Sequence, residues 1–214
     1  MVGFTKIILK PKYFYYKELT LSNDLTAITA YFLELDALKL VNRRTYIDGG
    51  ARLENSAEHS WHLAMACWSI SRSFNLDISE EKLLKLALIH DLGEIDAGDT
   101  FLYASDRSTA HTAEREGVKR LKNHTGNGVA ELSELWEEQE TGASLETKLL
   151  KVVDRMLPFL HNISSQGKTW RELGIKKSQV LAAHAFIAED FPEIHSWMLG
   201  NIEVAVSEGW LLDP

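Results

Sequence analysis

The chain has 214 residues, of which 45% are hydrophobic and 25% charged, proportions that are ordinary for a globular domain. Its formal net charge of −8 disfavours binding to nucleic-acid backbones, although a few arginines or a metal ion can still hold a small anion. A single cysteine, Cys67, excludes a disulfide framework. No apolar run is long enough to span a bilayer, and Met1 to Tyr16 lack a signal-peptide pattern, so we expect a cytoplasmic protein that binds no membrane.

The first elements are an arm and a helix. Residues 1–22 are aromatic and basic, which indicates an irregular or strand-like N-terminal arm before one domain over residues 23–214. A helical period then begins at Asn23, and one apolar face is formed by Leu25, Ile28, Phe32 and Leu35. This helix should end near Val41, before a polar loop over residues 42–53 that contains two glycines.

Two capped helices follow. Asn55 with Glu58 three residues later is typical of a capping box, and the apolar stripe behind it is Leu63, Ala66, Cys67, Ile70 and Phe74. Ser79 is the expected cap of a third helix, whose apolar face is Leu83, Leu84, Ala87 and Leu88.

Helical patterns continue to the end of the chain. We expect helices over residues 112–122 and 128–140, one with Leu149, Val152, Val153, Met156 and Leu157 on one side, and two at residues 177–189 and 193–208. No segment alternates with period two. The fold class is therefore expected to be all-α, a bundle of roughly eight helices with a C-terminal helical extension.

Four polar residues fall on or beside these apolar faces. His59 continues the stripe of the second helix, His90 and Asp91 extend that of the third, and Asp154 lies next to the later stripe. An unpaired buried carboxylate costs several kcal/mol unless a cation or a metal ion accompanies it. Two imidazoles and two carboxylates suit a divalent ion such as Mn, Co, Fe, Ni or Zn, with positions left for water and substrate.

Ordinary explanations compete with a metal site. A His-Asp dipeptide often arises by chance, and His59 alone is more typical of a core histidine. Asp154 alone would more often pair with an arginine. Spacing by itself therefore leaves both interpretations open.

The runs Glu54 to Trp61 and Leu88 to Thr100, followed by Asp154, resemble the H…HD…D pattern of the HD superfamily of metal-dependent phosphohydrolases, and within it the 5′-deoxynucleotidase-like group. The resemblance covers about residues 38–160. It implies an HD-domain helical bundle whose metal ligands are His59, His90, Asp91 and Asp154.

The resemblance also implies roles for nearby residues. Glu94 matches a catalytic acid residue beside the metal, and Asp99 matches a residue near substrate and nucleophile; the alternatives are a solvated helix-end carboxylate and a loop cap. Asp91 would hold the attacking water as well as the metal. Arg43 matches an arginine that meets the substrate phosphate, which suits a guanidinium fork. Arg44 stands where the characterised bacterial enzymes carry a tryptophan, which leaves base and sugar preference open.

The expected function is hydrolysis of a nucleoside 5′-monophosphate, with a deoxynucleotide as substrate and either Glu137 or Glu138 near the substrate mouth. The alternatives are a phosphohydrolase acting on a triphosphate or cyclic nucleotide, and a non-catalytic, metal-stabilised nucleotide sensor. Six tryptophans and eight phenylalanines in a small chain, together with the resemblance, favour a homodimer.

Overall fold

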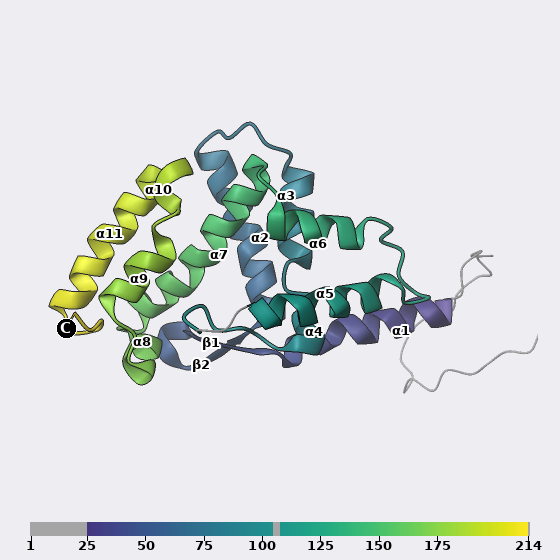
Figure 1. Ribbon diagram of the computed structural model, residues 1–214, viewed down its shortest axis with the longest axis horizontal. Coiled ribbons are helices and arrows are strands. Elements are labelled where there is room, and N and C mark those ends of the chain that lie inside the picture. Colours follow the sequence, from purple (N-terminus) through teal and green to yellow (C-terminus); the bar gives the residue numbers. More distant parts are fainter. Residues whose placement is uncertain (1–24, 105–107, 214) are drawn as a thin grey trace, which may run out of the picture.

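The protein is almost entirely helical over residues 25–104 and 108–213, which the computed structural model describes (Figure 1). Eight of its helices are at least eight residues long, so the expectation of an all-α bundle is confirmed. The predicted arm over residues 1–22 lies outside the described residues, and the domain boundary stays a prediction. Among the described helices, none is both long and apolar enough to cross a membrane.

Three helices form the centre of the molecule: α2 (Ser56–Ser73), α3 (Glu80–Ile89) and α7 (Leu145–Ser164). Helix α2 begins with the predicted capping box, in which the Asn55 side chain accepts from the Glu58 amide and the Glu58 carboxylate accepts from the Asn55 amide. Ser79 caps α3 by accepting from the Lys82 amide. Because each helix packs against the other two, their buried faces meet in one core.

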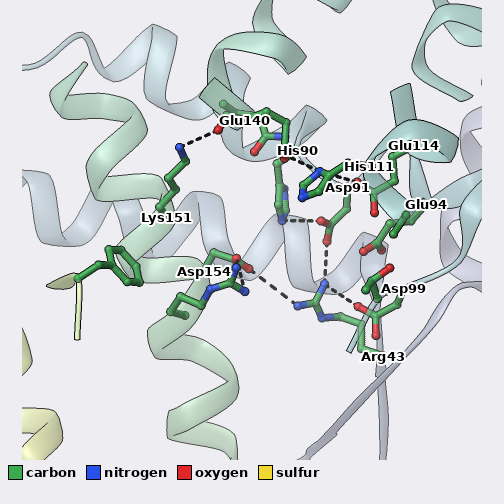
Figure 2. A pocket seen from close by; sticks show the side chains of 15 residues that line it. Arg43, His90, Asp91, Glu94, Asp99, His111, Glu114, Glu140, Lys151 and Asp154 are labelled. Carbon is green, nitrogen blue, oxygen red and sulfur yellow. Dashed lines mark hydrogen bonds and ion pairs between the residues drawn. The ribbon is translucent and has the colours of Figure 1, made fainter. Parts of the chain in front are cut away.

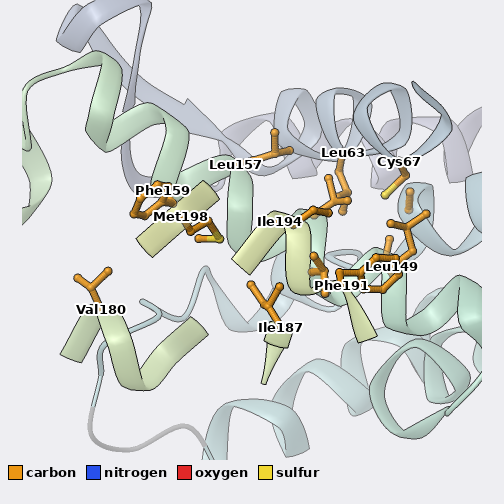
Figure 3. Close-up of a cluster of buried hydrophobic side chains, with 14 of the residues drawn as sticks. Leu63, Cys67, Leu149, Leu157, Phe159, Val180, Ile187, Phe191, Ile194 and Met198 are labelled. Carbon is orange, nitrogen blue, oxygen red and sulfur yellow. The ribbon is translucent and has the colours of Figure 1, made fainter. Parts of the chain in front are cut away.

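The C-terminal helices cover one side of this centre (Figure 1). They are α8 (Lys168–Leu173), α9 (Lys177–His184), α10 (Ile187–Asp190) and α11 (Pro192–Ser207). Figure 3 shows how they add Val180, Ile187, Ile194 and Met198 to the apolar side chains of α2 and α7. The helix expected over residues 177–189 is broken into α9 and α10, and α8 lies between Gly167 and Gly174, where no helix was expected.

A smaller layer lies on the other side and contains α1 (Leu25–Asp36), a 3₁₀ turn (Ala37–Leu40), α4 (Glu94–Ala97), α5 (Ser108–Lys122) and α6 (Leu132–Thr141). The apolar face expected for the first helix was correct only in part, because Leu35 packs against the second cluster of buried residues. Leu25 and Phe32 are 55% and 59% exposed, whereas Tyr31 is buried at 5%. Helix α1 lies at the edge of the molecule, and only its Tyr31 side reaches the second cluster of buried residues (Figure 1).

The loop expected over residues 42–53 is instead an antiparallel hairpin of β1 (Asn42–Ile47) and β2 (Arg52–Asn55), joined by a tight turn at Asp48–Gly50. Burial alternates along β1, but the buried residues are Arg43 and Thr45. The strand therefore carries no apolar period-two signal. Gly50 has φ +102°, which favours glycine in this turn. Strand β1 packs on α7 and so directs Arg43 toward it.

Candidate active site

The sequence-predicted metal ligands converge where α2, α3 and α7 meet. His59 lies on α2 and is fully buried, Asp154 lies on α7, and Nε2 of His59 is 3.0 Å from Oδ1 of Asp154. His90 directly follows α3, and its ring centroid is 5.4 Å from that of His59. Packing of three helices thus brings together residues that are up to 95 positions apart in the chain.

His90 is held in one orientation by its backbone contacts. Its Nδ1–H donates to the carbonyl of Ala87 at 2.8 Å, which leaves the lone pair on Nε2. Nε2 is buried without a hydrogen-bond partner and lies 3.1 Å from Oδ1 of Asp91. Trp136 donates its indole N–H to the His90 carbonyl and fixes the end of α3. A backbone-oriented histidine with a free Nε2 is the arrangement that metal-binding histidines show.

The ligand atoms of His59, His90 and Asp91 all lie within 4.8 Å of one another. Asp154 adjoins this group through His59. Two imidazoles and two carboxylates around a buried, unpartnered nitrogen fit a divalent ion of borderline hardness.

Arg43 lies among the carboxylates of the site (Figure 2). Its Nη1 donates to Oδ2 of Asp91 at 2.8 Å and lies 3.5 Å from Asp99. Its Nη2 is 3.9 Å from Asp154, and its Nε is 3.4 Å from Glu54. One buried guanidinium therefore neutralises charges from four parts of the chain.

Glu94 and Asp99 lie beside this group on and after α4. Glu94, the first residue of α4, is 7% exposed and accepts a 2.6 Å hydrogen bond from the Ser56 hydroxyl. Gly98, with φ +78°, lets the chain turn so that Asp99 comes within reach of Arg43.

The pKa shifts separate Asp91 and Asp154 from Glu94 and Asp99. Burial raises the pKa of Asp91 and of Asp154, but His90 and Arg43 near Asp91, and His59 near Asp154, hold each below its usual range. Burial, with the neighbouring Asp91 charge, raises the pKa of both Glu94 and Asp99. Opposed shifts of this kind separate groups suited to holding a cation from groups suited to holding a proton.

His59 shares its ring between two carboxylates. Burial and the Arg43 charge lower the pKa of His59, but hydrogen bonding to Asp154 and Glu54 outweighs them and raises it to about 9. Nδ1 is 3.3 Å from Oε2 of Glu54, so this carboxylate lies behind the ring as Asp154 lies in front. A metal ion at Nε2 would displace a proton, which makes its affinity pH-dependent.

A cavity of about 380 Å³ is lined by His90, Asp91, Glu94, Asp99 and Asp154, whereas His59 does not line it (Figure 2). Besides Arg43 it has two further cationic side chains, Lys151 and Arg155, both from α7. The other lining residues that sequence reasoning did not identify are Thr100, Ala110, His111, Glu114, Gln139, Glu140 and Phe186. Lys151 could have been identified from the sequence, because it lies one helical turn before Asp154.

The acidic residue of α6 at this cavity is Glu140, so the expectation of Glu137 or Glu138 was wrong. Glu137 pairs with Arg115, and Glu138 pairs with Lys82. Arg44, which alternates with Arg43 on β1, is exposed and does not line the large cavity. It borders a smaller adjoining one of about 40 Å³ together with Tyr103 and Thr169.

A helical bundle in which histidine and aspartate side chains converge from three packed helices is typical of proteins with a metal site. The HD domain family model matches residues 35–195, and the chain belongs to this family. Among solved structures, it is similar to a protein of Magnetospirillum magnetotacticum described as a predicted metal-dependent phosphohydrolase. The TM-score is 0.77 at 30% identity, over 89% of this chain and 96% of that one.

Curated relatives match over a shorter region. The 5′-deoxynucleotidase HDDC2 of Danio rerio is 32% identical over 48% of this chain and 51% of its own. The human protein of that name is 30% identical over 49% and 50%, and the 5′-deoxynucleotidase YBR242W of Saccharomyces cerevisiae 27% identical over 60% and 56%. The chain spans about half the length of the curated relatives it matches.

Proposed function

We propose that the protein is a metal-dependent phosphohydrolase that removes phosphate from a nucleoside 5′-monophosphate, with deoxynucleotides as the preferred substrates. The observation that carries the proposal is one cavity in which the histidine–aspartate group adjoins three cationic side chains, Arg43, Lys151 and Arg155. Cationic forks and ammonium groups bind phosphate, and the overall charge of −8 makes their local concentration informative. The names of the relatives support this substrate class.

His59, His90, Asp91 and Asp154 would hold the divalent ion, which when bound would supply Lewis-acid polarisation of phosphate and water. Arg43 would neutralise phosphate charge as it develops in the transition state. Asp91, which is ionised, would orient the water that attacks phosphorus. Glu94, whose buried carboxyl holds a proton, would donate that proton to the departing 5′-oxygen, and Asp99 would assist by hydrogen bonding.

The proposed substrate is tested with a panel on purified protein. Deoxy- and ribonucleoside 5′-monophosphates, their 3′-isomers, triphosphates and a cyclic nucleotide are supplied with Mn²⁺, Co²⁺ or Mg²⁺ in turn. We expect inorganic phosphate from 5′-monophosphates, fastest from the deoxy series. Release of diphosphate or tripolyphosphate would indicate another phosphohydrolase instead. Tight nucleotide binding with no turnover under any metal would indicate a sensor.

The metal centre is tested with Asp91→Ala. Because one ligand is removed from helices that pack independently of it, we expect loss of activity and of bound metal with most helicity retained. Circular dichroism, metal analysis and phosphate release are measured on the same preparation. A variant that binds metal stoichiometrically and turns over at the wild-type rate would disprove the ligand set.

A further inference from the structure

We propose a second cation site, formed by Glu54, His62 and His161, that binds a Zn²⁺-like divalent ion behind His59. These residues come from β2, α2 and α7, and their ligand atoms lie within 4.8 Å of one another. None of the three is among the metal ligands proposed above, His59, His90, Asp91 and Asp154, which together form the HD centre. Two imidazoles and a carboxylate form a ligand set that Zn²⁺ takes in proteins.

Glu54 faces both sites with different oxygens. Oε2 lies toward the HD centre, 3.3 Å from Nδ1 of His59 and 3.4 Å from Nε of Arg43. Oε1 lies 3.9 Å from Nδ1 of His161. A carboxylate can serve two neighbours in this way, because each oxygen has its own lone pairs.

One ligand atom of the proposed site lacks the partner that burial demands. Nδ1 of His161 is buried without a hydrogen bond, and it lies 3.9 Å from Oε1 of Glu54, which is only 1% exposed. Buried polar atoms without partners are rare and costly, and a bound ion would satisfy those that face it.

His62 connects the proposed cation site to solvent. It lies three residues after His59, partly exposed on α2, and its ring stacks on that of His161 with centroids 5.6 Å apart. Ligand atoms around tetrahedral Zn²⁺ are about 3.4 Å apart, so shifts of about 1 Å would close the site.

An ion here would tie together β2, α2 and α7. Of these, α2 presents His59, α7 presents Asp154, and β2 pairs with the strand that carries Arg43. The site would therefore stiffen the frame of the HD centre without being part of it.

The test counts Zn²⁺ ions per chain by equilibrium dialysis with elemental analysis. We expect two for the wild type and one for His90→Gln/Asp91→Asn, in which the HD centre is disabled. Adding His62→Gln/His161→Gln should weaken the remaining site by more than about 100-fold, since loss of an outer-sphere partner alone costs about 10–100-fold. His195→Gln, which removes an imidazole from α11, is the matched control and should leave both sites intact.

Thermal unfolding provides a second readout. Zn²⁺ should raise the Tm of the HD-disabled protein, and His62→Gln/His161→Gln should abolish that rise. Binding that does not depend on His62 and His161 would overturn the proposal, as would a HD-disabled protein that binds no Zn²⁺. Because this protein lacks the HD ligands, neither result depends on whether the proposed hydrolase activity is correct. If the HD-disabled protein does not fold, His62→Gln alone should lower the wild-type count from two to one, and an unchanged count would overturn the site.

Discussion

Glu94 and Arg43 both lie beside Asp91, and their charges and burial suit them to different roles. Glu94 is buried, accepts from the Ser56 hydroxyl and has a raised pKa, so it can hold a proton at neutral pH. Arg43 is a buried cation that contacts Asp91 directly. Removing Glu94 should therefore affect proton transfer. Removing Arg43 should affect how the negative charges of the site and of the substrate phosphate are neutralised.

Glu94→Ala should keep metal stoichiometry and bring nucleotide affinity within a few-fold of wild type, but lower kcat by roughly 10²–10⁴, the usual contribution of a positioned acid–base group. The measurements are kcat, KM and bound metal on one deoxynucleoside monophosphate. Glu81→Ala removes a carboxylate from the surface of α3 and should change none of them. Metal loss in Glu94→Ala would make Glu94 a ligand, and a full kcat would show that the buried Glu94 has no catalytic role.

Arg43→Ala should raise KM, because a phosphate-binding group is lost, and should lower kcat as well if the contact tightens in the transition state. The contacts of Arg43 predict that Arg43→Ala also lowers the free energy of unfolding. Arg43 also neutralises the buried Glu54 and Asp91, and breaking a buried ion pair costs about 3–5 kcal/mol. Denaturant unfolding of Arg43→Ala and Arg43→Lys measures this, and an unchanged free energy of unfolding for Arg43→Ala would contradict it.

At the scale of elements, the site depends on how closely α4 approaches α5. A Cβ added at Gly93 would lie 2.6 Å from Cβ and 2.7 Å from backbone atoms of Glu114, and Gly93 directly precedes Glu94. Nothing at this contact can move without shifting a helix. The glycine therefore sets the position of the catalytic candidate next to it.

Gly93→Ala should destabilise the protein by about 1–3 kcal/mol through overpacking and lower kcat by displacing Glu94. Gly200→Ala is the matched control, since its added Cβ meets nothing within 4 Å inside α11. That variant should be stabilised by up to about 1 kcal/mol with normal kcat. Denaturant midpoints and kinetics test both, and equal behaviour of the two variants would count against the close approach.

At the scale of the whole molecule, the core carries a titratable group away from the site. His184 is 2% exposed and its Nδ1–H donates to the Val180 carbonyl at 2.6 Å. Burial lowers the pKa of His184, so the native state keeps the imidazole neutral.

This shift predicts a pH-dependent loss of stability. Below the unfolded pKa of about 6.5, the unfolded chain binds a proton that the native chain does not, so stability falls as pH decreases through that value toward the lower native pKa. His184→Met should therefore flatten the fall in Tm between pH 7.5 and pH 5. Parallel Tm curves for His184→Met and the wild type would contradict this.

Assembly also belongs to this scale. The homodimer expected from the composition and the resemblance stays a prediction, and Phe32, Leu33 and Trp61, which are 59%, 75% and 65% exposed, are the apolar side chains that it would cover. Light scattering should give twice the chain mass at micromolar concentrations. A monomer mass throughout that range would disprove the dimer.

Local periodicity and one motif determined which features could be predicted from the sequence. The helices α2, α3 and α7 follow from an apolar stripe and from caps at Asn55 and Ser79, which act within a few residues. His59, His90, Asp91 and Asp154 stood out as polar residues near those stripes. The resemblance to the HD superfamily then singled out Glu94 and Arg43, which the structure places beside Asp91.

Contacts between distant segments could only be decided by the tertiary structure. Strand β1 was missed because its buried face is Arg43 and Thr45, which are buried by partners elsewhere in the chain. Glu140, rather than Glu137 or Glu138, lines the cavity because packing sets which side of α6 faces it. The cluster of Glu54, His62 and His161 joins three elements, and no spacing within one element encodes it. Burial of a polar group depends on its partners, and those partners exist only in the folded chain.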